Sequence, residues 1–136
     1  VSAAQVFSVV NVLPLPIWAV WMLAPRSPLA RWLARSFWPW TVLAAIYAVT
    51  LAVAVAHEPA GSFTSLAGVM ALFDSPWGAL AGWVHYLCFD LFVGRWIVND
   101  APEGGRRLAV PLFLTLMVGP VGLLTYLGGR RFFQGR

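Results

Sequence analysis

The stretch Trp77–Asp100, WGALAGWVHYLCFDLFVGRWIVND, combines a length that suits a membrane with polar side chains in its interior. About 22 mostly apolar residues are enough for one helix to cross a bilayer, at about 1.5 Å per residue. His85, Tyr86 and Asp90 nevertheless lie inside it. An aspartate in the middle of a span costs on the order of 3 kcal/mol to insert. Asp90 is therefore the residue of this stretch that most needs an explanation.

Helical geometry divides this stretch into two faces. At about 100° per residue, one face carries Trp83, Tyr86, Asp90, Gly94 and Ile97. The nearly opposite face carries His85, Phe89, Phe92 and Trp96. His85 and Asp90 therefore do not meet on one helix, whereas Tyr86 and Asp90 can form a phenol-to-carboxylate hydrogen bond. Gly94, one turn beyond Asp90, would let another helix or a ligand come close.

The composition indicates an integral membrane protein. Of 136 residues, 60% are hydrophobic and only 10% are charged, and the mean hydropathy is +0.77. The net charge of +4 comes from arginines clustered at the ends of apolar segments, so it indicates topology and no nucleic-acid partner. The single Cys88 excludes an internal disulfide and an all-cysteine metal site, and we expect no metal.

Four apolar segments predict an all-α membrane protein, a single bundle of four transmembrane helices formed by residues 1–136. The expected spans cover about 4–23, 38–56, 77–98 and 108–127. Asn11 and two prolines interrupt the first span, and Gly119–Pro120 should kink the last. Asn11 is either a hydrogen-bonding residue between helices or a ligand contact.

Two loops are predicted to hold short helices at the membrane interface. In the first loop, 24–37, arginines recur at roughly helical spacing beside Leu29, Trp32 and Leu33, which favours an amphipathic helix. The second loop, 57–76, has no basic residue. There Ser62 is the expected N-cap of a short helix that ends near Phe73, and Asp74–Ser75–Pro76 should begin the third span.

The arginines leave two topologies open. With the first and third loops in the cytoplasm, five loop arginines obey the positive-inside rule, but the C-terminal arginines then lie on the far side. A fifth, buried half-span from the second loop would reverse that end. VSAAQVFSVV at the start has no basic residue, so we expect no signal peptide. The expected location is a multi-pass position in a bacterial inner or photosynthetic membrane.

Three motifs resemble a family of small membrane proteins that includes plant neoxanthin synthase, known from an abscisic-acid-deficient mutant. The family pattern is LAGV-x-x-LF, then AGW-x-HY-x-x-FDLF-x-GRW, then GP-x-GLL-x-Y. It matches this chain at 66–73, 81–96 and 119–126. NVLPLPIWAVWMLAP looks like the family's first span, so the resemblance covers nearly the whole chain.

The resemblance implies carotenoid chemistry without a cofactor. The plant reaction opens an epoxide of violaxanthin to an allenic alcohol and exchanges no electrons. An acid must assist departure of the epoxide oxygen, and a base must remove a proton next to the ring. Asp90 would be the acid, and His85 or Tyr86 would move the proton. Alternatively, Asp90 pairs with Arg95 of a neighbouring chain, or with the Tyr86 hydroxyl, as a helix–helix contact.

The candidate ligand contacts are Trp83, Phe89, Phe92, Gly94, Trp96 and Asn11, of which the four aromatic residues would form a polyene groove. The aromatic members are alternatively packing and interface-belt residues. Whether the chain is an enzyme stays open. The leading hypothesis is an epoxy-carotenoid isomerase or carotenoid-binding protein, and the alternative is a non-catalytic transmembrane subunit of a larger, pigment-containing photosynthetic complex. A small transporter would need an aqueous path past Asn11, Asp90 and Asp100. The expected partners are the lipid bilayer, a carotenoid, and further copies or partner membrane subunits.

Overall fold

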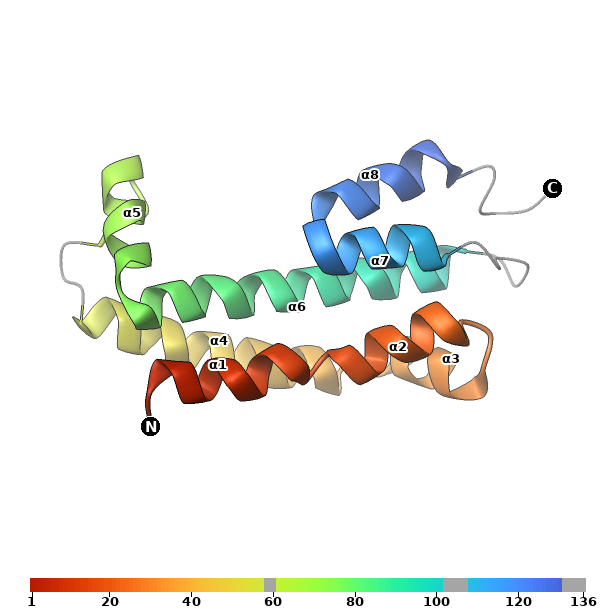
Figure 1. Ribbon diagram of the computed structural model, residues 1–136, viewed down its shortest axis with the longest axis horizontal. Coiled ribbons are helices and arrows are strands. Elements are labelled where there is room, and N and C mark those ends of the chain that lie inside the picture. Colours follow the sequence, from red (N-terminus) through yellow and green to blue (C-terminus); the bar gives the residue numbers. More distant parts are fainter. Residues whose placement is uncertain (58–60, 102–107, 131–136) are drawn as a thin grey trace. The chain divides into compact units, whose positions relative to one another are not determined.

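The computed structural model describes residues 1–57, 61–101 and 108–130, and the regular structure in these ranges is helical. The helices are α1 (Ala3–Val12), α2 (Leu15–Leu23), α3 (Pro28–Arg35), α4 (Trp38–His57), α5 (Leu66–Asp74), α6 (Pro76–Asp100), α7 (Ala109–Val118) and α8 (Pro120–Gly128) (Figure 1). The all-α prediction is therefore confirmed. The helices predicted over 38–56 and 77–98 are α4 and α6.

The chain divides into two compact units. The first unit consists of Val1–Leu13 and Trp40–Cys88, and the second of Pro14–Pro39 and Phe89–Arg136. Helix α6 contributes its first half to the first unit and its second half to the second unit. One four-helix bundle over residues 1–136 stays a prediction.

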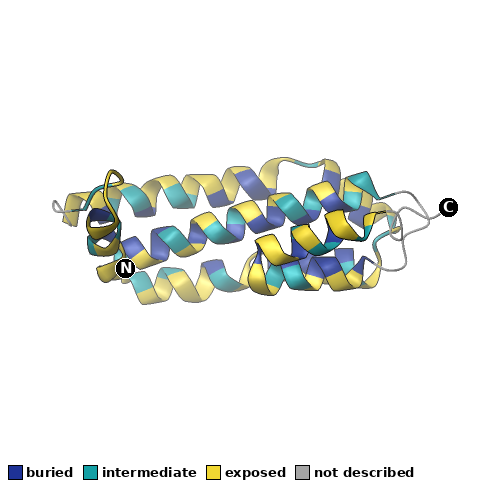
Figure 2. Cartoon of the chain, turned by 90° about the horizontal axis from the view of Figure 1, so that it is seen from above, coloured by how far each residue is buried: buried dark blue, intermediate teal, exposed yellow. Residues whose placement is uncertain are grey.

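In the first unit, α1, α4 and the first half of α6 run side by side, and α5 stands across the start of α6 (Figure 1). The three long helices turn strips of buried residues inward (Figure 2). The buried apolar side chains of the unit include Val10, Leu43, Ala54, Leu80 and Val84. Small residues such as Ala54 and Ala81 keep these helices close, as is typical of membrane helices.

Serine side chains set the boundaries around α5. Helix α5 is capped by Ser65, whose hydroxyl accepts a hydrogen bond from the Gly68 amide at 3.1 Å. The predicted N-cap Ser62 is wrong, because Ser62 lies four residues before the first residue of α5, and its hydroxyl instead accepts from the Thr64 amide at 3.2 Å. The predicted start of α6 is confirmed: Ser75 accepts from the Gly78 amide at 3.0 Å, and Pro76 occupies the first turn.

In the second unit, α2 packs against α3 and α7, and α7 packs against α8. The rings of Trp18 and Trp21 meet edge to face with centroids 5.9 Å apart, and both side chains are buried. The Trp21 indole donates to the Ala30 carbonyl at 3.2 Å, which ties α2 to α3. The predicted helix in the first loop is thus confirmed as α3, with Ser27 as its N-cap.

The single kinked helix predicted over 108–127 is wrong. Two helices, α7 and α8, replace it, and the break lies at the predicted Gly119–Pro120. Gly119 has φ 53° and ψ −109°, a conformation that L side chains rarely adopt, and Pro120 opens α8. A Cβ atom on Gly122 would lie 2.2 Å from the amide nitrogen of Thr115, so only glycine allows α8 to fold back this closely onto α7.

Two stretches in the described residues are long and apolar enough to cross a membrane. They are Ala3–Leu23, with 21 residues and a break between α1 and α2, and Trp38–His57, with 20 residues. Helix α6 is longer, at 25 residues, but carries more polar and aromatic side chains. Four membrane spans stay a prediction. Most of the predicted third loop, 102–107, and the C-terminal arginines Arg131 and Arg136 lie outside the described residues.

Candidate functional site

The nine predicted site residues fall into the two units. Asn11, Trp83, His85 and Tyr86 belong to the first unit. Phe89, Asp90, Phe92, Gly94 and Trp96 belong to the second. Each unit therefore has to be considered as a possible location of its own site.

Trp83 connects α6 to α1 in the first unit. Its indole donates a hydrogen bond to the Asn11 side-chain oxygen at 3.0 Å. Its ring lies 5.8 Å from the ring of Phe7 and 5.3 Å from that of Tyr86. Asn11 thus makes the contact between helices that was one of its two predicted roles. An apolar hollow of about 390 Å³ lies beside these rings and is lined by Phe7, Leu80 and Trp83 among others.

His85 lies on a different side of α6 and faces a groove. The His85 and Tyr47 rings meet edge to face with centroids 5.3 Å apart. Both line a hollow of about 260 Å³ enclosed by α4, α5 and the first turns of α6. We call this hollow the aromatic groove; its lining residues are Tyr47, Leu51, Ala54, Phe63, Val69, Leu72, Phe73, Gly78, Ala81, Gly82 and His85. Tyr47 and His85 supply polar tips to a lining that is otherwise apolar.

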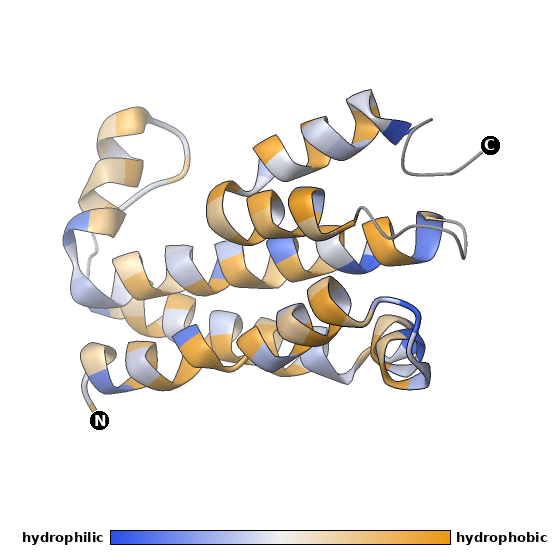
Figure 3. Ribbon diagram, turned by 45° about the vertical axis from the view of Figure 1, so that its right-hand side comes forward, coloured by the Kyte–Doolittle hydropathy of each residue, from blue (hydrophilic) through white to orange (hydrophobic). Residues whose placement is uncertain are grey.

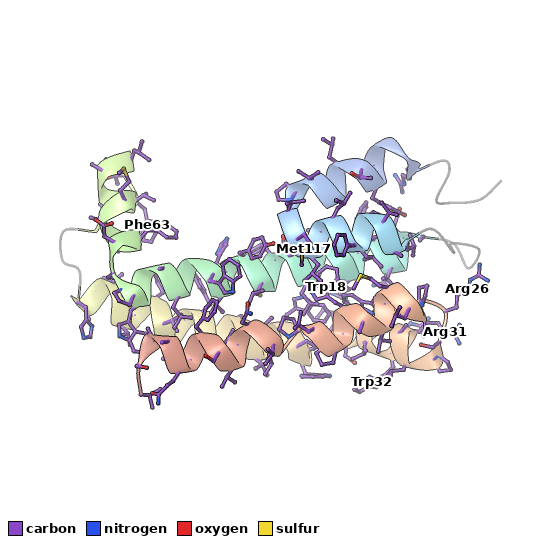
Figure 4. All side chains as sticks on the ribbon, in the orientation of Figure 1. Trp18, Arg26, Arg31, Trp32, Phe63 and Met117 are labelled. Atoms are coloured by element: carbon purple, nitrogen blue, oxygen red, sulfur yellow. The ribbon has the colours of Figure 1, made fainter. Side chains whose placement is uncertain are left out.

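The far wall of the aromatic groove comes from α5 and the segment before it. Phe63 projects from that segment beside α5 (Figure 4). Phe73 lies against Gly82, where an added Cβ would approach its ring to 2.2 Å. The sequence did not point to Tyr47, Phe63 or Phe73 as site residues. Tyr47 did leave a signal, because it is the one phenol in the apolar run of α4.

Four further predicted contacts lie in the second unit, where Phe89 is 59% exposed and Phe92, Gly94 and Trp96 have neighbours within the unit. A Cβ atom on Gly94 would lie 2.6 Å from the Trp18 ring, so the space beside Gly94 holds that side chain. The Trp96 ring meets Tyr126 edge to face at 5.6 Å. Arg95 lies over the rings of Phe37 at 4.4 Å and Phe92 at 5.7 Å.

Asp90 is buried in the second unit, with 8% of its surface exposed. Its predicted contact with Tyr86 and its predicted pairing with an arginine of a neighbouring chain stay predictions. Arg95 of the same chain donates from Nε to the Ala34 carbonyl at 2.7 Å and therefore contacts the end of α3. In the described residues, no group of three or more His, Cys, Asp or Glu side chains is placed to hold a metal ion.

Comparison with known proteins gives one family and one curated relative. The model of the ABA DEFICIENT 4-like family matches residues 5–126. "Protein ABA DEFICIENT 4, chloroplastic" from Arabidopsis thaliana is 26% identical over 131 residues, which cover 91% of this chain and 60% of the relative. The chain thus spans about 60% of the length of the curated relative it matches. No solved structure matches the chain.

Proposed function

The chain belongs to the ABA DEFICIENT 4-like family, and we propose that it is a membrane protein that binds an oxygenated carotenoid. Its sequence motifs resemble those of the family that includes plant neoxanthin synthase. The aromatic groove is the proposed binding site for one end ring of the carotenoid. The groove carries this proposal because it combines apolar walls with two polar tips, Tyr47 and His85, at one place.

The size of the groove favours an end ring over the whole carotenoid. Pockets that enclose a drug-sized molecule measure roughly 300–1,000 Å³, and the aromatic groove measures about 260 Å³. Phe63 and Phe73 are more than half exposed, at 69% and 53%, so the groove opens between aromatic rings. A polyene chain is apolar and would leave through this opening into lipid, where exposed aromatic side chains carry no cost.

Tyr47 and His85 can form hydrogen bonds with an oxygen atom on the carotenoid end ring. The Tyr47 hydroxyl can donate to an epoxide or hydroxyl oxygen, and a neutral imidazole has one donor and one acceptor nitrogen. For an epoxide ring, the pair also supplies an acid and a base. The reaction breaks one C–O bond and one C–H bond, and the proton lost from carbon balances the proton gained by oxygen. No oxidant or reductant is needed. Isomerisation is therefore the reaction that we assign to the groove.

Pigment analysis in a carotenoid-producing host tests this function. We expect the wild-type chain to co-purify with an oxygenated carotenoid or to change the extracted pigments. His85→Leu should lose most of this effect, because it keeps an apolar wall and removes the polar tip. His57→Leu is the matched control, since His57 lies at the end of α4 and its Nδ1 bonds the Val53 carbonyl at 2.8 Å. No pigment effect with epoxy, hydroxy or keto carotenoids would contradict the proposal.

A non-catalytic subunit of a larger membrane complex is the alternative. Purification in mild detergent separates the two functions. A free oligomer that retains pigment supports the proposed function, whereas migration with a large complex and no pigment of its own supports the alternative.

A further inference from the structure

The end of α3 is tied to the last turns of α6. The Arg95 Nε donates to the Ala34 carbonyl at 2.7 Å, and the Asn99 side-chain amide donates to the same oxygen at 3.1 Å. The C-terminal carbonyls of a helix lack partners within the helix and carry partial negative charge, so a guanidinium and an amide satisfy this end well. Arg35, next to Ala34, and Arg31, one turn earlier in α3, thereby lie near the last turns of α6.

The end of α8 is tied to the same turns of α6. Arg130, just beyond α8, binds Asp100 with two hydrogen bonds, Nη2 to Oδ1 at 2.7 Å and Nε to Oδ2 at 3.1 Å. The Tyr126 hydroxyl donates to Asp100 Oδ2 at 2.8 Å. Asp100 is the last residue of α6. Both contacts bring the end of α8 back to the end of α6, from which α7 departs.

The contact of Arg130 with Asp100 is incompatible with one straight helix over residues 108–130. Residues 108–130 as a single helix would be about 33 Å long, which would carry Arg130 across a whole bilayer core. Instead α7 and α8 have 10 and 9 residues, about 15 Å each, and α8 turns back over α7 (Figure 1). The turn satisfies its own backbone, because the Gly119 amide donates to the Thr115 carbonyl and the Gly122 amide to the Gly119 carbonyl. Gly119 itself is buried, whereas Val118, Pro120 and Val121 around it expose apolar side chains. Pairing of the backbone groups is what the apolar bilayer core requires of such a turn.

We propose that α7–α8 is a re-entrant hairpin and that the arginines of α3 face a layer of anionic lipid headgroups on the side of the membrane to which α8 returns. This proposal rests on the membrane location proposed above. It requires three spans, α1–α2, α4 and α6, in place of four. Arg130 then lies on the same side as the first loop with its three arginines, as the positive-inside rule favours. No lysine or arginine occurs between residues 36 and 94.

The surface of α3 fits such a headgroup layer. Arg26, Arg31 and Trp32 extend away from the second unit (Figure 4), and Leu29 and Trp32 are 51% and 55% exposed. Ala30, Leu33 and Ala34 are buried on the other side of the helix. The hydrophilic residues of the unit gather around α3, in the last turns of α6 and at the end of α8 (Figure 3). A short helix that exposes arginine beside tryptophan and leucine is typical of anionic membrane surfaces.

Labelling with a membrane-impermeant maleimide in sealed vesicles tests the hairpin. In a Cys88→Ala background, Ala24→Cys reports the first loop, Ala67→Cys reports α5, and Gly128→Cys reports the end of α8, where the added side chain meets nothing within 4 Å. We expect Gly128→Cys and Ala24→Cys to react from one side and Ala67→Cys from the other. Reaction of Gly128→Cys together with Ala67→Cys would overturn the hairpin. Equal reaction of all three from one side would instead overturn the membrane location itself.

Melting in vesicles of defined composition tests the lipid contact. We expect phosphatidylglycerol mixed with phosphatidylcholine to raise the melting temperature of the wild-type chain by several degrees over phosphatidylcholine alone, and high salt to reduce this shift. Arg31→Gln combined with Arg35→Gln should lose most of the shift. Asp74→Asn on α5 is the charge-change control and should retain it. An unchanged shift in the double arginine variant would overturn the contact with anionic headgroups.

Discussion

At the scale of single residues, Asp90 remains the group that most separates a catalytic interpretation from a structural one. It is buried in the second unit, whereas His85 and Tyr47 line a groove of the first unit. An Asp90→Asn variant keeps the size and much of the hydrogen bonding of the side chain and removes the ionisable group. The stability and the activity of this variant depend on which group Asp90 contacts.

We expect Asp90→Asn to fold, with a melting temperature within a few degrees of wild type. Arg95 keeps its contacts with the Ala34 carbonyl and the Phe37 ring in that variant, and asparagine itself supports helix association in lipid. Thermal melting in detergent measures this. If Asp90 and Arg95 instead form a buried ion pair, the variant should lose about 3–5 kcal/mol. Restoration of the fold by adding Arg95→Leu would then contradict our expectation.

Sequence periodicity predicted the faces of α6 but not their neighbours. It separated His85 from the face of Trp83 and Tyr86, and the structure gives the two faces different partners: His85 meets Tyr47, and Trp83 meets Asn11 and Phe7. Periodicity within one helix carries no information on which other helix packs against each face. Tyr47 and Phe73 were missed for that reason.

Among the secondary-structure elements, α7 and α8 are joined by a turn that depends on two glycines, Gly119 and Gly122. Gly122→Ala should destabilise the protein by about 1–3 kcal/mol, because its methyl group would overlap the Thr115 backbone. Gly128→Ala, on the same helix but in open space, is the control and should leave the melting temperature unchanged or slightly raised. Equal melting temperatures for the two variants would show that α7 and α8 do not pack this closely.

Pro120→Ala should have a smaller effect than Gly122→Ala. Pro120 opens α8, where its missing amide costs nothing, and Gly119 makes the turn with its positive φ. We expect a loss of about 0.4–1 kcal/mol, from the greater freedom of the unfolded chain. Chemical unfolding in detergent measures this difference. A loss larger than that of Gly122→Ala would assign the turn to the proline.

The sequence indicated where the helix breaks between α7 and α8, but not how far the chain changes direction there. Gly-Pro in an apolar segment is equally consistent with a kink in one span and with a complete turn. The choice depends on whether residue 115 can contact residue 122, which requires the three-dimensional fit of Thr115 against a bare Gly122. Helices with strong local signals were predicted well. Ser75 caps α6 as predicted, whereas the cap of α5 is Ser65 and not the predicted Ser62.

At the scale of the whole molecule, the distribution of charge and the contacts of α6 carry the account of topology. Hydropathy alone predicts four spans, which put the C-terminal arginines on the side opposite the first and third loops. The pairs Arg130–Asp100 and Arg95–Ala34 link both arginine-bearing segments to the end of one helix. Contacts between residues 30 and 61 positions apart are not encoded in any local pattern, so the sequence alone could not indicate these two links.

The amount of carotenoid bound per chain, before and after the aromatic groove is filled, shows whether the groove is the binding site. Leu51→Trp places a larger ring in the groove, and Val55→Trp on the same helix adds the same ring at an exposed position that does not line it. The absorption spectrum of each protein, purified from a carotenoid-producing host, gives the ratio of pigment to protein. We predict that both variants fold, that Val55→Trp keeps the wild-type ratio of pigment to protein, and that Leu51→Trp loses most of its bound pigment. Equal pigment in the two folded variants would contradict binding in the groove.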